Sequence, residues 1–437
     1  MPANLFKTAI EKNRSGQRTG FYSVCSANEI VIRAAIRHAV QNNYPLIIES
    51  TSNQVNQFGG YTGMLPHEFI SMVQKISREE GQPKENLIPG GDHLGPLLWQ
   101  NENESSAMEK ATDMVHAYTL AGYGKIHIDT SMKLADDLPG PLDIRICARR
   151  GAALAREVFK TYNGMLSKET QSGGIQNQPA RPALVIGSEV PVPGGSQVHE
   201  DSITPTKAAD FLDQVNYFRE EFGKAGVDFN DVIAFVIQPG VEFGDDHIFQ
   251  YDPEKAKELT AALKSVSGIV FEGHSTDYQS RENLAALVRD GVAILKVGPA
   301  LTFALREGLC LLEAIEEITI PEANRSGFKK TLLSEMDSSR KYWVNYYSGT
   351  AAEIEYKKLY SYSDRCRYYL PGDNVRNAMN TLFGNIPSVP PALLSQFLPA
   401  QYRRFFAGKL NNDPLSLLYD RIADVCADYA FASGFIS

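Results

Sequence analysis

The sequence predicts an α/β fold, namely a (β/α)8 TIM barrel with a C-terminal helical extension. The first observation is that eight short apolar runs recur along the chain. The second is that helix-like segments separate these runs, and a barrel of parallel strands requires this alternation. Near-continuous apolar and β-branched runs suit strands that are buried on both faces. The runs are 20–27, 45–51, 87–95, 125–131, 183–190, 232–240, 268–276 and 293–302.

The segments between the runs carry the start and stop signals of amphipathic helices. Asn28 stands at the N-cap position of "NEIVIRAAIRHAVQNN", and Ser105 at that of "ESSAMEKATDMVHAYTLAGYG". Gly122 or Gly124 would end the second of these helices. A doubly wound sheet is the alternative fold, but it normally has a glycine-rich first turn, which "SVCSANE" lacks.

Three regions need a separate interpretation. Residues 167–182 are polar and are predicted to form a flexible excursion before the fifth strand, and the glycine-rich "PVPGGS" at 191–196 is interpreted as a mobile lid. We expect the barrel to span residues 1–319. Residues 320–437 show helical patterns and many aromatic residues, so we expect this extension to pack on the barrel or on a partner chain.

The composition narrows the class of protein. A net charge of −9 and the lack of a basic patch argue against a nucleic-acid partner. The five cysteines show no CxxC spacing, which is typical of reduced thiols in the cytoplasm. We find neither a signal peptide nor a run of the ~18 apolar residues that a membrane span needs. We therefore expect a cytoplasmic protein with no membrane partner.

Polar residues gather where the predicted strands end, and barrel enzymes build their sites there. His93 and His274 each close a strand near a carboxylate, so we expect both in a site. His127 lies inside the apolar run "KIHIDTS" and is interpreted as a hydrogen-bonded core residue. The strand-end residues are Glu49, Ser52, Asn53, Gln54, Asp92, His93, His127, Asp129, Glu189, Gln238, Glu242, Glu272, His274, Ser275, Asp277 and Lys296.

Some of these residues could bind a metal ion. His93, His274 and Glu189 have the side-chain types of a divalent metal site, and Gln238 offers a further oxygen donor. The alternative is a polar network that binds substrate without a metal.

Two loops could bind a phosphate group. "GHSTDYQS" supplies Gly273, Ser275 and Thr276 before a helix, where backbone N–H groups attract anions. "KVGPALT" supplies Gly298 and Thr302 after the eighth strand. No GxxxxGK[ST] motif occurs, so ATP-dependent phosphoryl transfer has no support and no nucleotide cofactor is expected.

Four amides follow the second strand in "LIIESTSNQVNQFGGYTGM". Amides donate and accept hydrogen bonds without carrying a charge, so they suit the recognition of sugar hydroxyls. The alternative is a loop that bonds to its own backbone, and Gln57 is the first candidate for such a role. The four residues are Asn53, Gln54, Asn56 and Gln57.

Long motifs spread over nearly the whole chain resemble one known family. They are "ESTSNQVNQFGGYTGM", "GGDHLGP", "GSEVPVPGG", "QPGVEF", "HSTDYQ", "LKVGPALTFALRE", "PEANRSG" and "SDRCRYY". The family was first described as the non-catalytic subunit of class II tagatose-bisphosphate aldolase. Some of its members are tagatose-6-phosphate 4-epimerases, and some carry the label of tagatose-6-phosphate kinase.

A more distant likeness is to the catalytic class II aldolases, which are zinc barrels. That likeness implies that Asp92 is an acid/base, that His93 and His274 bind a metal, and that Glu189 matches a strand-five glutamate. The chain departs from the aldolases at Gln238, where they have a histidine ligand. The departure puts tight zinc binding in doubt and leaves Mg²⁺ or Mn²⁺ open.

The resemblance implies a main function and an alternative. The main expectation is an isomerase, a D-tagatose 6-phosphate 4-epimerase that forms D-fructose 6-phosphate by a retro-aldol route in galactitol and tagatose catabolism. Asp92 and Glu189 would be catalytic, and a Zn²⁺, Mg²⁺ or Mn²⁺ ion would bind His93, His274 and Glu189. The alternative is a non-catalytic subunit that stabilises a separate class II aldolase chain, and a homo-oligomer is compatible with both. The phosphorylated ketose would contact Asn53, Gln54, Asn56, Gln238, Gly273, Ser275, Thr276 and Lys296.

Overall fold

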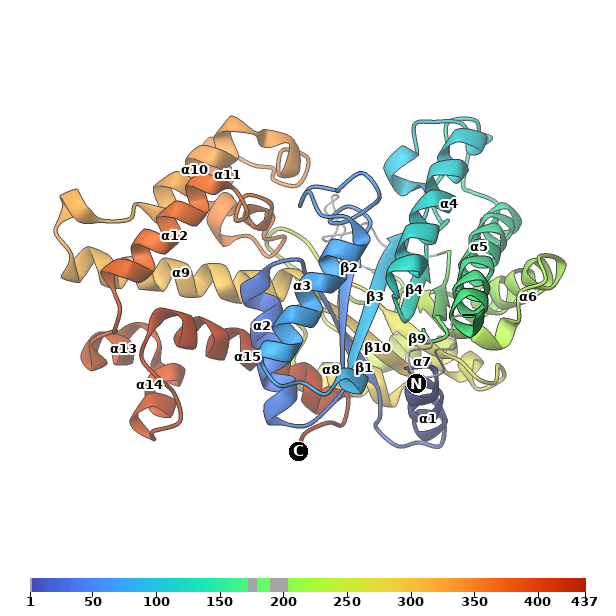
Figure 1. The fold of residues 1–437 in the computed structure, drawn as a ribbon, viewed down its shortest axis with the longest axis horizontal. Coiled ribbons are helices and arrows are strands. Elements are labelled where there is room, and N and C mark those ends of the chain that lie inside the picture. The colour runs from blue at the N-terminus through green and yellow to red at the C-terminus, as the bar shows by residue number, and fades with distance from the viewer. Residues whose placement is uncertain (1, 172–178, 189–202) are drawn as a thin grey trace.

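The computed structural model of the protein describes residues 2–171, 179–188 and 203–437. Eight parallel strands close into a barrel in the order β1-β10-β9-β6-β5-β4-β3-β2 (Figure 1). They coincide with the eight predicted runs, so the predicted (β/α)8 barrel is confirmed. The strands are β1 (Phe21–Cys25), β2 (Leu46–Thr51), β3 (Leu87–Leu94), β4 (Lys125–Ile128), β5 (Ala183–Ile186), β6 (Val232–Ile237), β9 (Val270–Gly273) and β10 (Val292–Val297), with a hairpin of β7 (Glu242–Phe243) and β8 (Ile248–Phe249) after β6.

One helix follows each strand of the barrel, and the cap residues fix where these helices begin and end. Asn28 accepts hydrogen bonds from the N–H groups of Ile30 and Val31, as predicted. The fourth helix begins earlier than expected, because Asn103 and not Ser105 accepts the N–H of Ser106. The barrel helices are α2 (Glu29–Gln41), α3 (Pro66–Glu79), α4 (Glu104–Ala121), α5 (Ile144–Gln171), α6 (Ala208–Lys224), α7 (Pro253–Leu263), α8 (Arg281–Arg289) and α9 (Pro299–Thr319).

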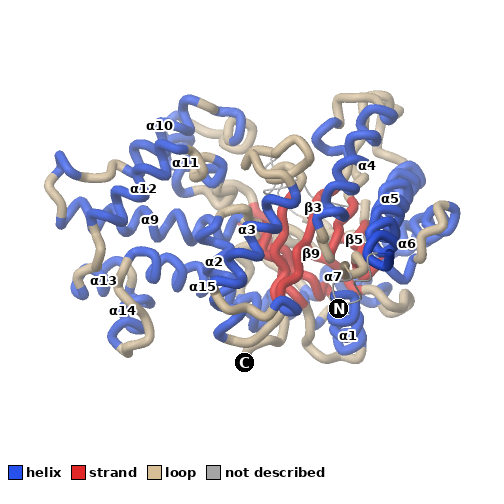
Figure 2. Tube along the Cα trace, viewed as in Figure 1, coloured by secondary structure: helices blue, strands red, loops and turns tan. Residues whose placement is uncertain are grey.

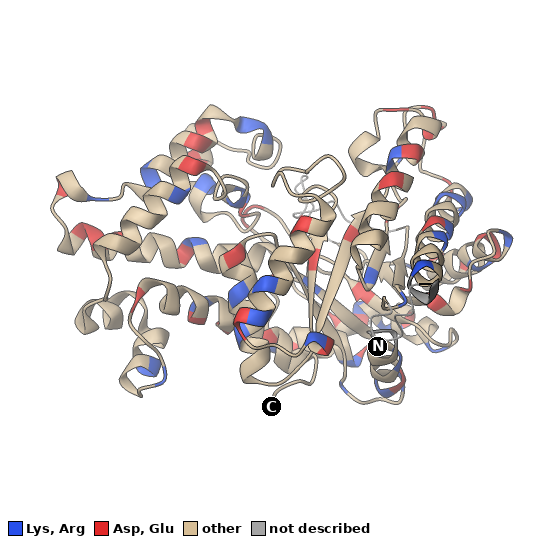
Figure 3. Cartoon of the chain, viewed as in Figure 1, with Lys and Arg blue, Asp and Glu red and all other residues tan. Residues whose placement is uncertain are grey.

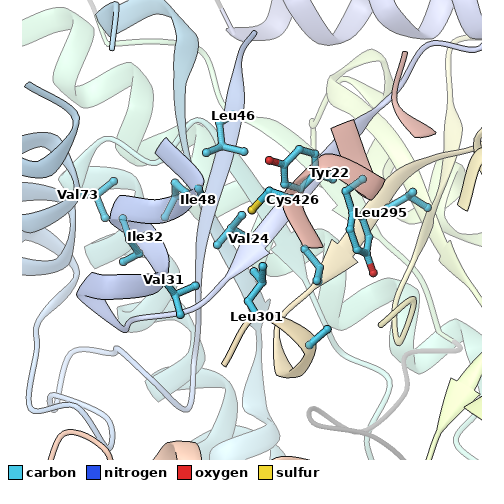
Figure 4. Close-up of a cluster of buried hydrophobic side chains, with 14 of the residues drawn as sticks. Tyr22, Val24, Val31, Ile32, Leu46, Ile48, Val73, Leu295, Leu301 and Cys426 are labelled. Carbon is cyan, nitrogen blue, oxygen red and sulfur yellow. The ribbon is translucent and has the colours of Figure 1, made fainter. Parts of the chain in front are cut away.

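Two apolar clusters hold the barrel together. Inside it, Ile47, Ile88 and Val236 pack with Phe6 of α1 (Pro2–Arg14), which covers the N-terminal ends of the strands. Outside it, strand residues pack against the helices, and Figure 4 shows part of this cluster, including Val24, Ile48, Val31 and Val73. Full burial of one such aliphatic side chain contributes about 1.5–3 kcal/mol. The polar cluster of the site lies at the other end of the strands.

The C-terminal extension is helical, and within residues 320–437 it has no strand (Figure 2). Its last helix returns to the barrel and contacts α2, α8 and α9. There the Tyr429 hydroxyl donates to the carbonyl oxygen of Thr276, at 2.7 Å. The helices of the extension are α10 (Phe328–Ser338), α11 (Ala351–Tyr360), α12 (Asp373–Asn385), α13 (Pro391–Phe397), α14 (Pro399–Phe406) and α15 (Pro414–Ala432).

A short 3₁₀ helix, Arg365–Tyr368, brings the extension to the open end of the barrel. The ring of Tyr368 stacks on Tyr342, with centroids 4.7 Å apart, and lies 4.8 Å from Tyr61 in the loop after β2. The extension therefore contacts a loop of the barrel as well as its outer helices.

Two further features of the fold are the predicted excursion at residues 167–182 and the distribution of charged residues. Helix α5 continues to Gln171, so the first part of 167–182 is helical, while 172–178 and the proposed lid at 191–196 lie outside the described residues. Acidic and basic residues are interspersed along the surface helices (Figure 3). In the described part of the chain, no helix has the length and apolar character needed to cross a membrane.

Candidate functional site

The ends of the barrel strands bring a set of charged side chains together at the centre of the barrel, which we call the central cluster. The GGDH sequence of β3 shapes it. Pairing with β4 shifts register after Gly91, and His93 has a φ of 50°, so both Asp92 and His93 face the same pocket. A Cβ at Gly90 would lie 2.6 Å from Cγ of Glu49, so glycine leaves room for that side chain. The central cluster consists of Glu49, Asp92, His93, Lys125, His127, Asp129, Glu272, His274 and Lys296, all buried.

Two lysines each bridge two carboxylates of the cluster. Lys125 Nζ lies 2.6 Å from Glu49 Oε1 and 2.7 Å from Glu272 Oε2. Lys296 Nζ lies 2.8 Å from Asp92 Oδ1 and also contacts Glu49 Oε2. Burial, opposed by the neighbouring Cys25, lowers the pKa of Lys296 to about 8. The pairs compensate charges that would otherwise be costly to bury.

Three histidines surround these ion pairs. The ring centroids of His93, His127 and His274 lie 5.0 to 5.2 Å from one another. Each ring has a carboxylate neighbour. His127 Nδ1 is 2.8 Å from Asp92 Oδ1, His93 Nδ1 is 2.9 Å from Asp129 Oδ2, and His274 Nε2 is 3.1 Å from Glu272 Oε1.

These contacts set the protonation of the cluster. Burial disfavours the charge of Asp92, but His93 and the hydrogen bond with His127 outweigh it, so the pKa of Asp92 lies well below its usual value. Burial alone would lower the pKa of His93, but Asp92 and Asp129 raise it to about 9. Burial likewise opposes ionisation of Glu272, yet Lys125 and His274 lower its pKa to about 2. At neutral pH Asp92 and Glu272 are therefore ionised.

The cluster fits a divalent cation. Asp92, His127, Glu272 and His274 offer ligand atoms that all lie within 4.8 Å of one another. Nε2 of His127 is buried and has no hydrogen-bond partner among the described residues. The cluster's four carboxylate side chains outnumber its two lysines, and carboxylate and imidazole groups are ligand types of a divalent ion. Such an ion would polarise a carbonyl oxygen of a bound ligand.

A pocket with a cavity volume of about 80 Å³ opens next to the central cluster. The extension completes its wall with Arg367 and Tyr368, and no strand-end pattern could have revealed these residues. The predicted site residues that line the pocket are Asn53, Gln54, Asp92, His93, His274, Ser275, Asp277, Lys296 and Gly298.

Several other predicted site residues bond to the protein itself. Oε1 of Gln238 accepts the N–H groups of Gly240 and Val241, so this oxygen closes a turn after β6. Oδ1 of Asn56 accepts the N–H groups of Phe58 and Gly60 in the same way. Of the other loop amides, Gln57 donates to the carbonyl of Lys110, and Gln54, which also lines the pocket, accepts the N–H of Thr51 through Oε1.

The two predicted phosphate loops are also occupied in part. The Thr276 hydroxyl donates to the carbonyl of Lys296, and Gly273 is buried in β9. One carboxylate oxygen of Asp277 accepts the N–H groups of Gly298 and Ala300 at the start of α9. Ser275 has a φ of 52° and keeps its place in the pocket wall.

Sequence reasoning missed two members of the cluster and could not place a third residue. His127 is buried and hydrogen-bonded to Asp92, as expected of a core residue, but its ring also lies beside those of His93 and His274. Lys125 was not singled out, although a lysine that opens an apolar strand is a signal of a buried ion pair. Glu189 lies outside the described residues, so its predicted role stays a prediction.

Comparisons with known proteins cover the whole chain. It is 42% identical over 429 residues to the D-tagatose-1,6-bisphosphate aldolase subunit GatZ of Salmonella agona, and 43% identical to that of Klebsiella pneumoniae, covering 97% of this chain and 98% of each relative. A crystal structure described as a probable tagatose 6 phosphate kinase from Sinorhizobium meliloti is 37% identical, with a TM-score of 0.84 over 94% of this chain and all of that one. The family model "D-tagatose-1,6-bisphosphate aldolase subunit GatZ/KbaZ-like" matches residues 6–434. The chain therefore belongs to the GatZ/KbaZ-like family of D-tagatose-1,6-bisphosphate aldolase subunits.

Proposed function

We propose that the protein is an accessory subunit of a D-tagatose-1,6-bisphosphate aldolase, which binds and stabilises a separate catalytic chain. The observation that carries this proposal is the end-to-end match to relatives named as such subunits, at 42% identity over 97% of the chain. The match includes the C-terminal extension as well as the barrel.

The isomerase predicted from the sequence is wrong on this evidence. The relatives that match the whole chain are named as subunits of an aldolase, not as epimerases. The alternative stated with that prediction, an accessory aldolase subunit, is the better supported one.

The site gives the accessory role physical support. In the catalytic aldolases that the chain distantly resembles, the sixth barrel strand delivers a histidine ligand. Here Gln238 stands at that position, and its side-chain oxygen is used by the N–H groups of Gly240 and Val241. The ion that fits the central cluster would use His127 of β4 instead. The donor set thus differs from that of the catalytic chains.

The pocket is part of the proposal, because an accessory subunit can still bind the sugar. Asn53, Ser275 and Lys296 lie in its wall, and we assign them to a phosphorylated ketose. The contacts of Asn56, Gly273 and Thr276 within the protein support structural roles for those three residues.

Size-exclusion chromatography of the protein mixed with a catalytic class II tagatose-bisphosphate aldolase tests the subunit role. We expect a single peak that contains both chains and has a larger apparent mass than either chain alone. A catalytic class II fructose-bisphosphate aldolase serves as the control and should elute separately. Each chain is loaded at about 10 μM, tenfold above the Kd of a micromolar interaction. Separate elution of this protein and the tagatose-specific aldolase would refute the proposal.

A further inference from the structure

The positively charged side chains in the wall of the pocket differ in whether a carboxylate contacts them. Lys296 contacts Glu49 and Asp92, and the His93 ring contacts Asp129. Arg367 also lines the pocket, but no described carboxylate oxygen lies within 4.0 Å of its guanidinium nitrogens. Its positive charge is therefore available to a ligand.

The Arg367 guanidinium is held in place by the extension. Its Nη1 donates to the carbonyl oxygens of Ser363 and Asp364, and its Nη2 lies 3.3 Å from the hydroxyl of Tyr368. Its Cζ lies 4.6 Å from the centroid of the Tyr368 ring. Nε donates to no other described residue, so one edge of the guanidinium keeps a free donor. Because these contacts already fix the Arg367 side chain, little conformational entropy of that side chain would be lost when a ligand binds.

Asp277 and Asp364 lie near Arg367, and Asp277 also lines the pocket, but neither carboxylate lies within ion-pair distance of the guanidinium. Asp277 accepts the N–H groups of Gly298 and Ala300, and Asp364 Oδ2 accepts the Thr302 hydroxyl at 2.6 Å. Because the N–H groups at the start of α9 and the Thr302 hydroxyl already make these bonds, they are not available to bind phosphate. An anion that enters the pocket would thus find its complementary charge at Arg367.

The rest of the pocket favours a polyhydroxy compound. The side chains of Asn53 and Ser275 line it, and no protein hydrogen bond is recorded for either of them within the described ranges. At the buried side, Asp92, His274 and Lys296 offer acceptors and donors to hydroxyl and carbonyl groups. A ligand with hydroxyl groups on one side and an anion on the other would satisfy both ends.

We infer that Arg367 forms an anion subsite for the phosphate group of a phosphorylated sugar whose hydroxyl groups face Asn53, Ser275 and the central cluster. The inference rests on the proposed function, because it takes the phosphorylated ketose of that function as the ligand. The free Nε–H and the remaining N–H of Nη2 would donate to phosphate oxygens, an arrangement that guanidinium groups favour. The extension would thereby set the preference for phosphorylated over free sugars.

Isothermal titration calorimetry on the full chain tests the subsite. The probes are D-tagatose 6-phosphate, D-tagatose, a hexuronate and inorganic phosphate. The wild-type protein should bind the sugar phosphate most tightly. Arg367→Gln should weaken that binding about tenfold or more, as expected for the loss of a hydrogen-bonded charge, and should leave the affinity for D-tagatose unchanged. Arg367→Lys, which keeps the charge but not the planar fork, should bind with intermediate affinity.

Arg376→Gln is the matched control, because Arg376 is exposed on α12 and pairs with Asp373. It should bind all probes like the wild type, and thermal unfolding should confirm that each variant is folded. Equal affinity of wild type and Arg367→Gln for the sugar phosphate would overturn the inference. So would D-tagatose, the hexuronate or inorganic phosphate binding as tightly as D-tagatose 6-phosphate. Since no catalytic chain is present, these results are independent of complex formation, and Arg367→Gln should still co-elute with the aldolase.

Discussion

Lys125 and Glu49 form an ion pair at the centre of the barrel, with 2.6 Å between Nζ and Oε1 and with both side chains fully buried. The pair is part of a chain of contacts, since Lys125 also contacts Glu272 and Glu49 also contacts Lys296. Four of the eight strands meet through these side chains. The charged centre is therefore a structural element of the barrel as well as a candidate binding site.

Lys125→Met should destabilise the protein strongly. The change leaves Glu49 and Glu272 buried with one cation fewer, and breaking a buried pair costs about 3–5 kcal/mol. Urea unfolding would measure the loss. Lys224→Met is the control, because Lys224 forms exposed pairs on α6 and should change stability by less than ~1 kcal/mol. A similar small loss in Lys125→Met would contradict the proposed role of the ion pair.

The central cluster should retain a divalent ion. We expect that dialysis of the protein against Zn²⁺, Mn²⁺ or Mg²⁺, followed by elemental analysis, will find one ion per chain for the ion that fits. His127→Gln removes the unpartnered Nε2 and should lower the affinity by at least the ~10–100-fold that loss of an outer-sphere partner costs. His116→Gln, on the surface of α4, should retain the ion. Equal retention by both variants would exclude His127 as a ligand.

The stability of the metal-free protein should depend on the protonation of His93. Burial opposes its charge, but Asp92 and Asp129 raise its pKa from 6.5 to about 9. A raised pKa means that the folded state holds the proton more tightly, so this stabilisation is complete below pH 6.5 and is lost as the pH rises through 9. The difference in unfolding free energy between wild type and His93→Gln, measured in EDTA, should decline over that range.

Asp129→Asn gives a second test of the same contact. It removes one of the two carboxylates that raise the pKa of His93, so the decline should move to lower pH. If the difference in unfolding free energy between wild type and His93→Gln does not change between pH 6 and pH 9, the His93 ring is not protonated in the folded protein.

The barrel could be predicted because each strand is a short apolar run and each helix carries its own cap. Asn28 shows how local this information is, since its side chain bonds to N–H groups two and three residues away. The site is a different case. That Asp92 and His93 close a strand is visible in the sequence, but the contact of Asp92 with Lys296 joins residues brought together only by closure of the barrel.

Arg367 marks the limit of prediction from the sequence. The motif "SDRCRYY" resembles a motif of the family, yet nothing in it shows that the extension folds back to the loop after β2. That return depends on aromatic contacts among Tyr61, Tyr342 and Tyr368, which lie far apart in sequence. In the same way, the loop amides could not be divided into pocket residues and loop supports, because Asn53 and Asn56 are the same residue type three positions apart.

The most direct test of the account is the cleavage of D-tagatose 1,6-bisphosphate, followed over time in three samples at one fixed temperature. The samples are this protein alone, the catalytic class II aldolase chain alone, and the two together. We predict no cleavage by this protein alone, a decaying activity for the catalytic chain, and a slower decay for the mixture. Cleavage by this protein alone, or identical decay with and without it, would contradict an accessory role.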